Sequence, residues 1–174
     1  MGTRRAVLLL GGLTLLGGCG FKLRQPPKLA FESIRSPGNF ATPVARELLR
    51  ALEQAGVRVV PPAPPRQPGL PPPETEPVDV VLDVLTDQRE RAVVGITATG
   101  QVRELQLRTR FRFRLRSGQG ADLIDDSELL QTRDISFTET AVLAKEAEEA
   151  LLFRDMQSDI VQQVMRRLAA VQVL

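Results

Sequence analysis

The strongest constraint on the fold is a strict two-residue alternation of apolar residues and arginines within residues 101–116. Only a β-strand places every second side chain on the same side of the backbone. One side carries Leu105, Leu107, Thr109, Phe111, Phe113 and Leu115. The other side carries Arg108, Arg110, Arg112, Arg114 and Arg116. The apolar side predicts burial against other elements, and the arginine side predicts an exposed sheet face.

Residues 78–97 predict an antiparallel partner for this strand, joined to it by a two-residue turn at Thr99-Gly100. The register of that turn places Asp87 and Asp83 opposite Arg112 and Arg116, and Arg89 and Arg91 opposite Arg110 and Arg108. Like-charged neighbours destabilise a sheet. Two interpretations of the arginine face are therefore equally supported: it binds an anionic partner, or its side chains extend into water.

One short and one long helix are also predicted. Thr42 as N-cap, Pro43 at the first helical position and Gly56 after the last turn indicate the first helix. Apolar residues at helical spacing over residues 141–171 indicate the second. Its apolar side includes Leu143, Ala147, Leu151, Ile160, Val161, Val164, Met165 and Leu168. Residues 29–36, 57–60 and 122–137 predict further strands, so two helices can cover one face of a sheet.

Residues 61–77 contain nine of the thirteen prolines in the chain. Proline lacks the backbone N–H that a helix interior or a central strand requires, so neither can form here. We expect a surface loop of polyproline II character. The alternative is a docking segment for an aromatic-lined groove.

The first eighteen residues have the features of an export signal. Arg4 and Arg5 precede an apolar run over residues 6–16, which is too short to span a bilayer. Leu16-Gly17-Gly18-Cys19 resembles the bacterial lipobox, and Cys19 is the only cysteine in the chain. We expect residues 1–18 to be removed, Cys19 to be acylated, and residues 19–28 to tether a single domain over residues 29–174. The alternative is an ordinary signal with a chance cysteine.

Cleavage at this site would leave 21 basic and 21 acidic residues, a formal net charge of zero. Because nucleic-acid binding needs a basic surface and aromatic stacking platforms, we expect no nucleic-acid partner. The chain has no histidine, and its one cysteine is expected to carry lipid. The sequence therefore predicts no catalytic residue, no metal site and no cofactor.

Several segments occur in an order that resembles the LptE family, also called RlpB. They are Cys19-Gly20-Phe21-Lys22-Leu23-Arg24, Arg46-Glu47-Leu48-Leu49, Gly56-Val57, Gly100-Gln101 and Leu143-Ala144-Lys145-Glu146. The resemblance implies an α+β fold, with two helices packed on one face of a mixed, mainly antiparallel four-stranded sheet. It also implies a non-enzymatic lipoprotein that plugs and helps assemble the outer-membrane β-barrel LptD and assists lipopolysaccharide transport to the outer leaflet.

The resemblance further implies site residues and a location. A basic lipopolysaccharide-binding position of the family falls on Lys145, and a second falls on Ala98-Thr99, where Arg91 and Arg103 lie nearby as substitutes. Further candidates for this lipid are Arg108 and Arg110, and Arg112, Arg114 and Arg116 complete the basic face. Gly20 after Cys19 implies sorting to the outer membrane. The alternative is a free outer-membrane lipoprotein that binds lipid or a periplasmic partner through the basic sheet face.

Overall fold

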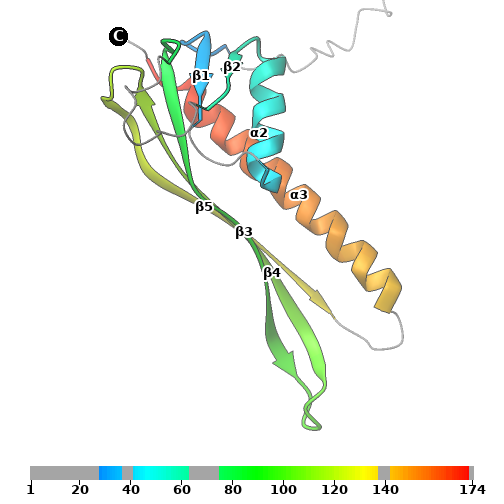
Figure 1. Cartoon of the computed structure of the whole chain (residues 1–174). Coiled ribbons are helices and arrows are strands. Elements are labelled where there is room, and N and C mark those ends of the chain that lie inside the picture. The colour runs from blue at the N-terminus through cyan, green and yellow to red at the C-terminus, as the bar shows by residue number, and fades with distance from the viewer. Residues whose placement is uncertain (1–27, 37–40, 63–74, 137–141, 173–174) are drawn as a thin grey trace, which may run out of the picture.

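The computed structural model describes residues 28–36, 41–62, 75–136 and 142–172. It contains the helices α2 (Pro43–Gln54) and α3 (Val142–Ala169). Its strands are β1 (Ser33–Arg35), β2 (Arg58–Val60), β3 (Val80–Ile96), β4 (Val102–Ser117) and β5 (Asp122–Ser136). Both helices lie on the same face of the sheet, which confirms the predicted two-layer α+β architecture (Figure 1). The predicted signal, Cys19 and most of the proline-rich segment lie outside the described residues.

The strands form one sheet in the order β2-β1-β3-β4-β5. Strand β1 runs parallel to both β2 and β3, whereas the β3–β4 and β4–β5 pairs are antiparallel. The sheet is therefore mixed and mainly antiparallel, as predicted, but it has five strands instead of four. The five strands correspond to the five segments whose sequence predicts a strand, whereas the count of four came from the family resemblance. Strand β2, whose three residues all pair with β1, forms one edge of the sheet.

The predicted register of the β3–β4 hairpin is wrong, because the turn has three residues instead of two. Thr97 N–H donates to the Gln101 carbonyl at 2.8 Å and Gly100 N–H donates to the Thr97 carbonyl at 3.0 Å. Gly100 has φ 82°, the left-handed conformation that such a loop needs at its last position. A shift of one residue moves side chains to the other face of the sheet. Arg89 and Arg91 consequently lie opposite Thr109 and Leu107, and not opposite Arg110 and Arg108.

The register also changes the role of Asp87, which lies opposite Phe111 on the helix-covered face. Its carboxylate accepts the backbone N–H groups of Val44 and Ala45, both at 3.0 Å. Thr42 occupies the N-cap position of α2, but its side chain makes no capping hydrogen bond. Asp87 therefore caps α2 from the sheet and does not pair with Arg112.

The predicted end of α2 is confirmed. Gly56 has φ 87°, and its N–H donates to the Glu53 carbonyl at 3.0 Å. Val57 N–H donates to the Leu52 carbonyl, also at 3.0 Å. This pair of bonds is the Schellman motif, which satisfies the last carbonyls of a helix and needs a glycine-like conformation. Val57 and Leu52 are both buried in the core, so the chain turns directly from the helix into β2.

The core has two parts between the sheet and the helices. The larger one joins both helices to β1, β3 and β4, and includes Leu48, Leu82, Phe111, Phe113 and Ile160. A smaller cluster of Leu107, Ile135, Phe153 and Met156 joins the middle of α3 to β4 and β5. The predicted apolar side of α3 is buried from Ile160 onward, but Leu143 and Leu151 are 82% and 54% exposed. No helix among the described residues is long and apolar enough to cross a bilayer.

Candidate functional site

The five alternating arginines of β4 lie on the sheet face opposite the helices, which we call the outer face. Their positions alternate with the buried Leu107, Thr109, Phe111, Phe113 and Leu115. Asp83, whose side chain is 10% exposed, accepts ion pairs from Arg116 at 2.9 Å and Arg114 at 3.2 Å. The hydrogen bond to Asp83 raises the pKa of Arg116. The predicted contact between Asp83 and Arg116 is thus found as an ion pair, but in the register Asp83 lies opposite Arg114 and not opposite Arg116.

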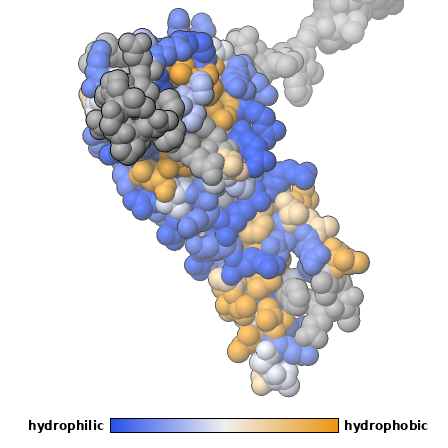
Figure 2. All heavy atoms as spheres, viewed as in Figure 1, coloured by the Kyte–Doolittle hydropathy of each residue, from blue (hydrophilic) through white to orange (hydrophobic). Residues whose placement is uncertain are grey.

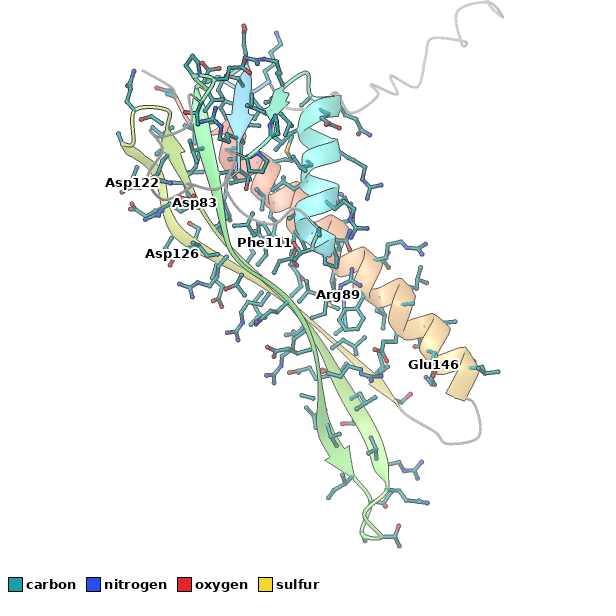
Figure 3. All side chains as sticks on the ribbon, viewed as in Figure 1. Asp83, Arg89, Phe111, Asp122, Asp126 and Glu146 are labelled. Atoms are coloured by element: carbon teal, nitrogen blue, oxygen red, sulfur yellow. The ribbon has the colours of Figure 1, made fainter. Side chains whose placement is uncertain are left out.

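Strand β5 supplies the remaining counter-charges of the outer face. Arg112 pairs with Asp126 and lies 3.9 Å from Glu128, which is also 3.9 Å from Arg110. The hydrogen bond to Asp126 raises the pKa of Arg112. Arg108 donates to Gln106 at 2.7 Å and lies opposite Glu90 of β3. The labelled Asp83, Asp122 and Asp126 all lie on this side of the sheet (Figure 3).

The outer face is therefore charge-balanced, because acidic residues of β3 and β5 flank the arginine row of β4. Asp126 and Glu128 alternate in the sequence, so a two-residue period was visible there. The sequence did not predict the register of β5 against β4, which brings these carboxylates to Arg112 and Arg110.

The other predicted cations lie at the end of the molecule that contains the β3–β4 turn and the start of α3, which we call the distal end. Arg91 of β3 pairs with Glu149 of α3 at 3.2 Å. Lys145, one helical turn before Glu149, pairs with Glu148 at 2.7 Å. Arg103 is exposed and makes no ion pair within the described part of the chain. The structure thus brings Arg91 and Lys145 to one end, whereas Arg108 and Arg110 lie on the outer face.

The distal end also exposes large apolar side chains. Strand β5 ends at Ser136, opposite Glu104. Beyond that point, among the described residues, β3 and β4 pair only with each other and project past α3 (Figure 1). We define the hairpin tip as residues 93–103, which adds the last rows beside the end of β5 to this two-stranded part. Its Val93, Val94 and Ile96 are 55%, 48% and 66% exposed. Figure 2 shows the apolar surface that gathers at this end. Exposed apolar patches of this kind are typical of interaction surfaces.

Sequence reasoning missed a third feature, a groove of about 890 Å³ between α2 and α3. Arg50 of α2, Arg89 of β3 and Arg154 of α3 all line it. Arg89 was assigned to the outer face by the predicted register, and the packing of α2 against α3 has no signature in the sequence. In Figure 3 the Arg89 side chain lies between the sheet and α3.

The described residues contain no group of three or more His, Cys, Asp or Glu side chains that could hold a metal ion. Their chemistry is instead that of ion pairs, guanidinium groups and exposed apolar side chains. This combination is suited to binding amphiphiles or protein partners.

The comparisons with known proteins agree with this architecture. A family model described as LptE, lipopolysaccharide-assembly, matches residues 27–168. Lipoprotein B from Nitrosomonas europaea has 30% sequence identity and a TM-score of 0.68, over 87% of this chain and 91% of that one. Rare lipoprotein B from Shewanella oneidensis has 21% identity and a TM-score of 0.60, over 79% and 92%.

A minor lipoprotein from Acinetobacter baumannii has 20% identity and a TM-score of 0.59, over 82% of this chain and 93% of that one. This structure and the Shewanella structure establish similarity of fold. No curated protein sequence matches the chain.

Proposed function

Because the chain belongs to the LptE family of lipopolysaccharide-assembly proteins, we propose that it is a non-enzymatic outer-membrane lipoprotein that plugs an LptD-like β-barrel. In this role it helps assemble the barrel and assists insertion of lipopolysaccharide into the outer leaflet. Acylation of Cys19 would anchor it, since several acyl chains bind a membrane stably and one chain binds only marginally.

The observation that carries the partner proposal is the exposed apolar hairpin tip. A two-stranded ribbon is only marginally stable in water on its own. Here Ile96 is exposed beyond the end of β5. Val93 and Val94 are exposed on β3 in the last rows of the three-stranded part, where β3 has no second neighbouring strand among the described residues. Burial of such side chains contributes about 25 cal/mol for each Å² of apolar surface removed from water. A protein partner that covers the tip would therefore stabilise both chains.

The outer face supports the same proposal in a different way. The lumen of an outer-membrane barrel is polar. A plug surface that enters it must not leave a charge buried and unpaired, because that is strongly destabilising. On the outer face Asp83 pairs with Arg114 and Arg116, and Asp126 pairs with Arg112. These internal pairs allow the face to meet a polar wall without needing a counter-charge from it.

For lipopolysaccharide we propose contact with phosphate groups at the distal end, through Lys145, Arg91 and Arg103. Arg103 has no ion pair among the described residues, and the pairs of Lys145 and Arg91 each use one carboxylate. Exposed ion pairs contribute only about 0–1 kcal/mol, so a phosphate can displace them. Arg108 and Arg110 remain candidates for the same ligand, although Arg110 lies within 3.9 Å of Glu128.

The test of the partner proposal is co-purification with tip variants. Val93→Asp with Ile96→Asp should reduce the amount of barrel that co-elutes from detergent-extracted membranes, because each side chain is more than half exposed and its partner contact is apolar. Leu151→Asp is the matched control, since Leu151 is 54% exposed on α3, outside both the tip and the outer face. Undiminished barrel in the tip variants would remove this support, and a lone lipoprotein in the wild-type eluate would favour the free-lipoprotein alternative.

Lipid binding has a separate test. Lys145→Glu and Arg103→Glu should each weaken binding of purified lipopolysaccharide, because they place a negative charge beside the phosphates. The comparison variant is Arg108→Glu with Arg110→Glu, which changes the outer face. A larger loss in the outer-face variant than in the distal-end variants would assign the lipid to the outer face instead, and unchanged affinity in folded variants of both sets would contradict the proposal.

A further inference from the structure

We propose that the groove between α2 and α3 binds a phosphorylated saccharide. The inference rests on the proposed function for the source of that saccharide, but it assigns a second site, away from the distal end. Three guanidinium groups from three different elements line this one groove: Arg50 of α2, Arg89 of β3 and Arg154 of α3. Two carboxylates, Glu47 and Asp155, line it as well.

Arg89 is held in place by contacts below the groove opening. Its guanidinium donates to the side-chain oxygen of Gln157 and lies 5.3 Å from the centre of the Phe153 ring. The Gln157 amide in turn donates to the Glu47 carboxylate. Gln157 is only 9% exposed, so this chain of contacts forms a fixed polar floor. The same hydrogen bond fixes the position of the Glu47 carboxylate.

The other two arginines lack carboxylate partners. Arg50 Nε donates only to the carbonyl of Arg46 on its own helix, at 3.4 Å. Arg154 is exposed and has no hydrogen bond or ion pair within the ranges that the structure describes. On the outer face, by contrast, Arg110, Arg112, Arg114 and Arg116 all have a carboxylate within 4.0 Å. Arg50 and Arg154 are therefore available to an anionic ligand of the groove, and a guanidinium binds phosphate through two parallel hydrogen bonds.

The uncharged lining of the groove favours a sugar over an inorganic anion. Gln54, Ser158 and Gln162 offer amide and hydroxyl groups that can both donate and accept hydrogen bonds. Sugar hydroxyls need such two-way partners. Ala51 and Ala150 also line the groove, and their small side chains leave space between the helices. A volume of about 890 Å³ lies within the range of small-molecule sites.

The experiment titrates the full-length acylated protein in mild detergent with three probes: glucosamine 6-phosphate, glucosamine and inorganic phosphate. We expect glucosamine 6-phosphate to bind more tightly than either other probe, as measured by calorimetry. Arg50→Gln combined with Arg154→Gln should weaken it about tenfold or more, because charged hydrogen bonds contribute about 1.5–3 kcal/mol. Neither arginine has a tertiary partner, so circular dichroism should report an unchanged fold.

The matched control is Arg166→Gln. Arg166 is an exposed arginine of α3, like Arg154, but it lies outside the groove, so its replacement should leave the affinity unchanged. Equal affinity for glucosamine 6-phosphate and inorganic phosphate would overturn the saccharide assignment. Equal loss in the groove and control variants, or no binding by any probe, would overturn the site. Co-elution of a barrel from the same preparation is scored separately, so failure of the groove and failure of the proposed function are distinguishable.

Discussion

Replacing Asp87 by alanine should destabilise the protein by about 2 kcal/mol through the loss of a helix cap. The Asp87 carboxylate accepts the N–H groups of Val44 and Ala45, both at 3.0 Å and partly buried. Loss of a cap costs about 1 kcal/mol, and loss of a negative charge at a helix N-terminus costs about 0.3–1 kcal/mol more. Desolvated N–H groups left without a partner add to that cost.

The assay is urea unfolding followed by circular dichroism. With a slope of about 1–3 kcal/mol per molar urea, the midpoint should fall by roughly 1 M. Asp87→Asn is the conservative comparison, because it keeps a side-chain oxygen as acceptor and loses only the charge. Its cost should therefore stay below about 1 kcal/mol.

A double-mutant cycle with Arg112 distinguishes this account from the register that the sequence predicted. In the structure Asp87 and Arg112 lie on opposite faces of the sheet. Their substitutions by alanine should therefore add to within about 0.5 kcal/mol. A coupling energy well above that value would mean that the two residues form an ion pair, and it would refute both the observed register and the capping role.

Three further predictions concern single residues. Hydrogen bonds from the Glu32 backbone and from the Ser33 side chain and backbone lower the pKa of Asp79. The free energy that Asp79 contributes to folding should therefore be complete above about pH 4 and be lost as the pH falls through the lowered folded value. Urea titrations of the wild type and Asp79→Asn at several pH values measure this, and equal acid sensitivity of both proteins would contradict it. Gly118→Ala should lower the free energy of unfolding by about 3 kcal/mol, because the added Cβ would lie 1.9 Å from the Val78 carbonyl oxygen. Gly120→Ala should lower it by only about 1 kcal/mol in the same assay, because the Cβ has open space and only the φ of 98° is unfavourable. Phe153→Leu should remove the cation–π contact that positions Arg89, whose guanidinium lies 5.3 Å from the ring centre. The affinity for glucosamine 6-phosphate should then fall severalfold in calorimetry, and an unaltered affinity would show that the ring does not contribute to binding in the groove.

Local patterns predicted most of the elements because their causes lie within a few residues. The alternation of residues 101–116 reflects the pleat of β4, whose apolar side is buried from Leu107 to Leu115. Pro43 and Gly56 mark the two ends of α2 because the first removes an N–H that a first turn does not use and the second adopts φ 87°.

The features that failed depend on contacts between distant segments. One extra residue in the turn at Gly100 moved Arg89, Arg91 and Asp87 to the helix-covered face. The ion pairs of the outer face required the β4–β5 register, which no local pattern specifies. Leu143 and Leu151 have the spacing of a buried stripe, yet both are exposed, because the N-terminal part of α3 diverges from the sheet (Figure 1).

The predicted site residues rest on different grounds from the fold. Lys145, Arg91 and Arg103 were assigned by resemblance and neighbourhood, and whether they bind lipopolysaccharide stays a prediction. Arg50 and Arg154 had no signal at all, because a groove between two helices exists only after both helices pack on the same sheet. The assignment of Cys19 rests on the sequence, since it lies outside the described residues.

The most direct test of the central claim is affinity purification of the full-length protein from detergent-extracted membranes, with the stoichiometry of every co-eluting protein measured. The account predicts one large outer-membrane β-barrel in equal amount with the lipoprotein. It also predicts that the complex persists in high salt, because the outer-face charges are already paired within the chain. A lipoprotein that elutes alone, as a monomer, would contradict the account.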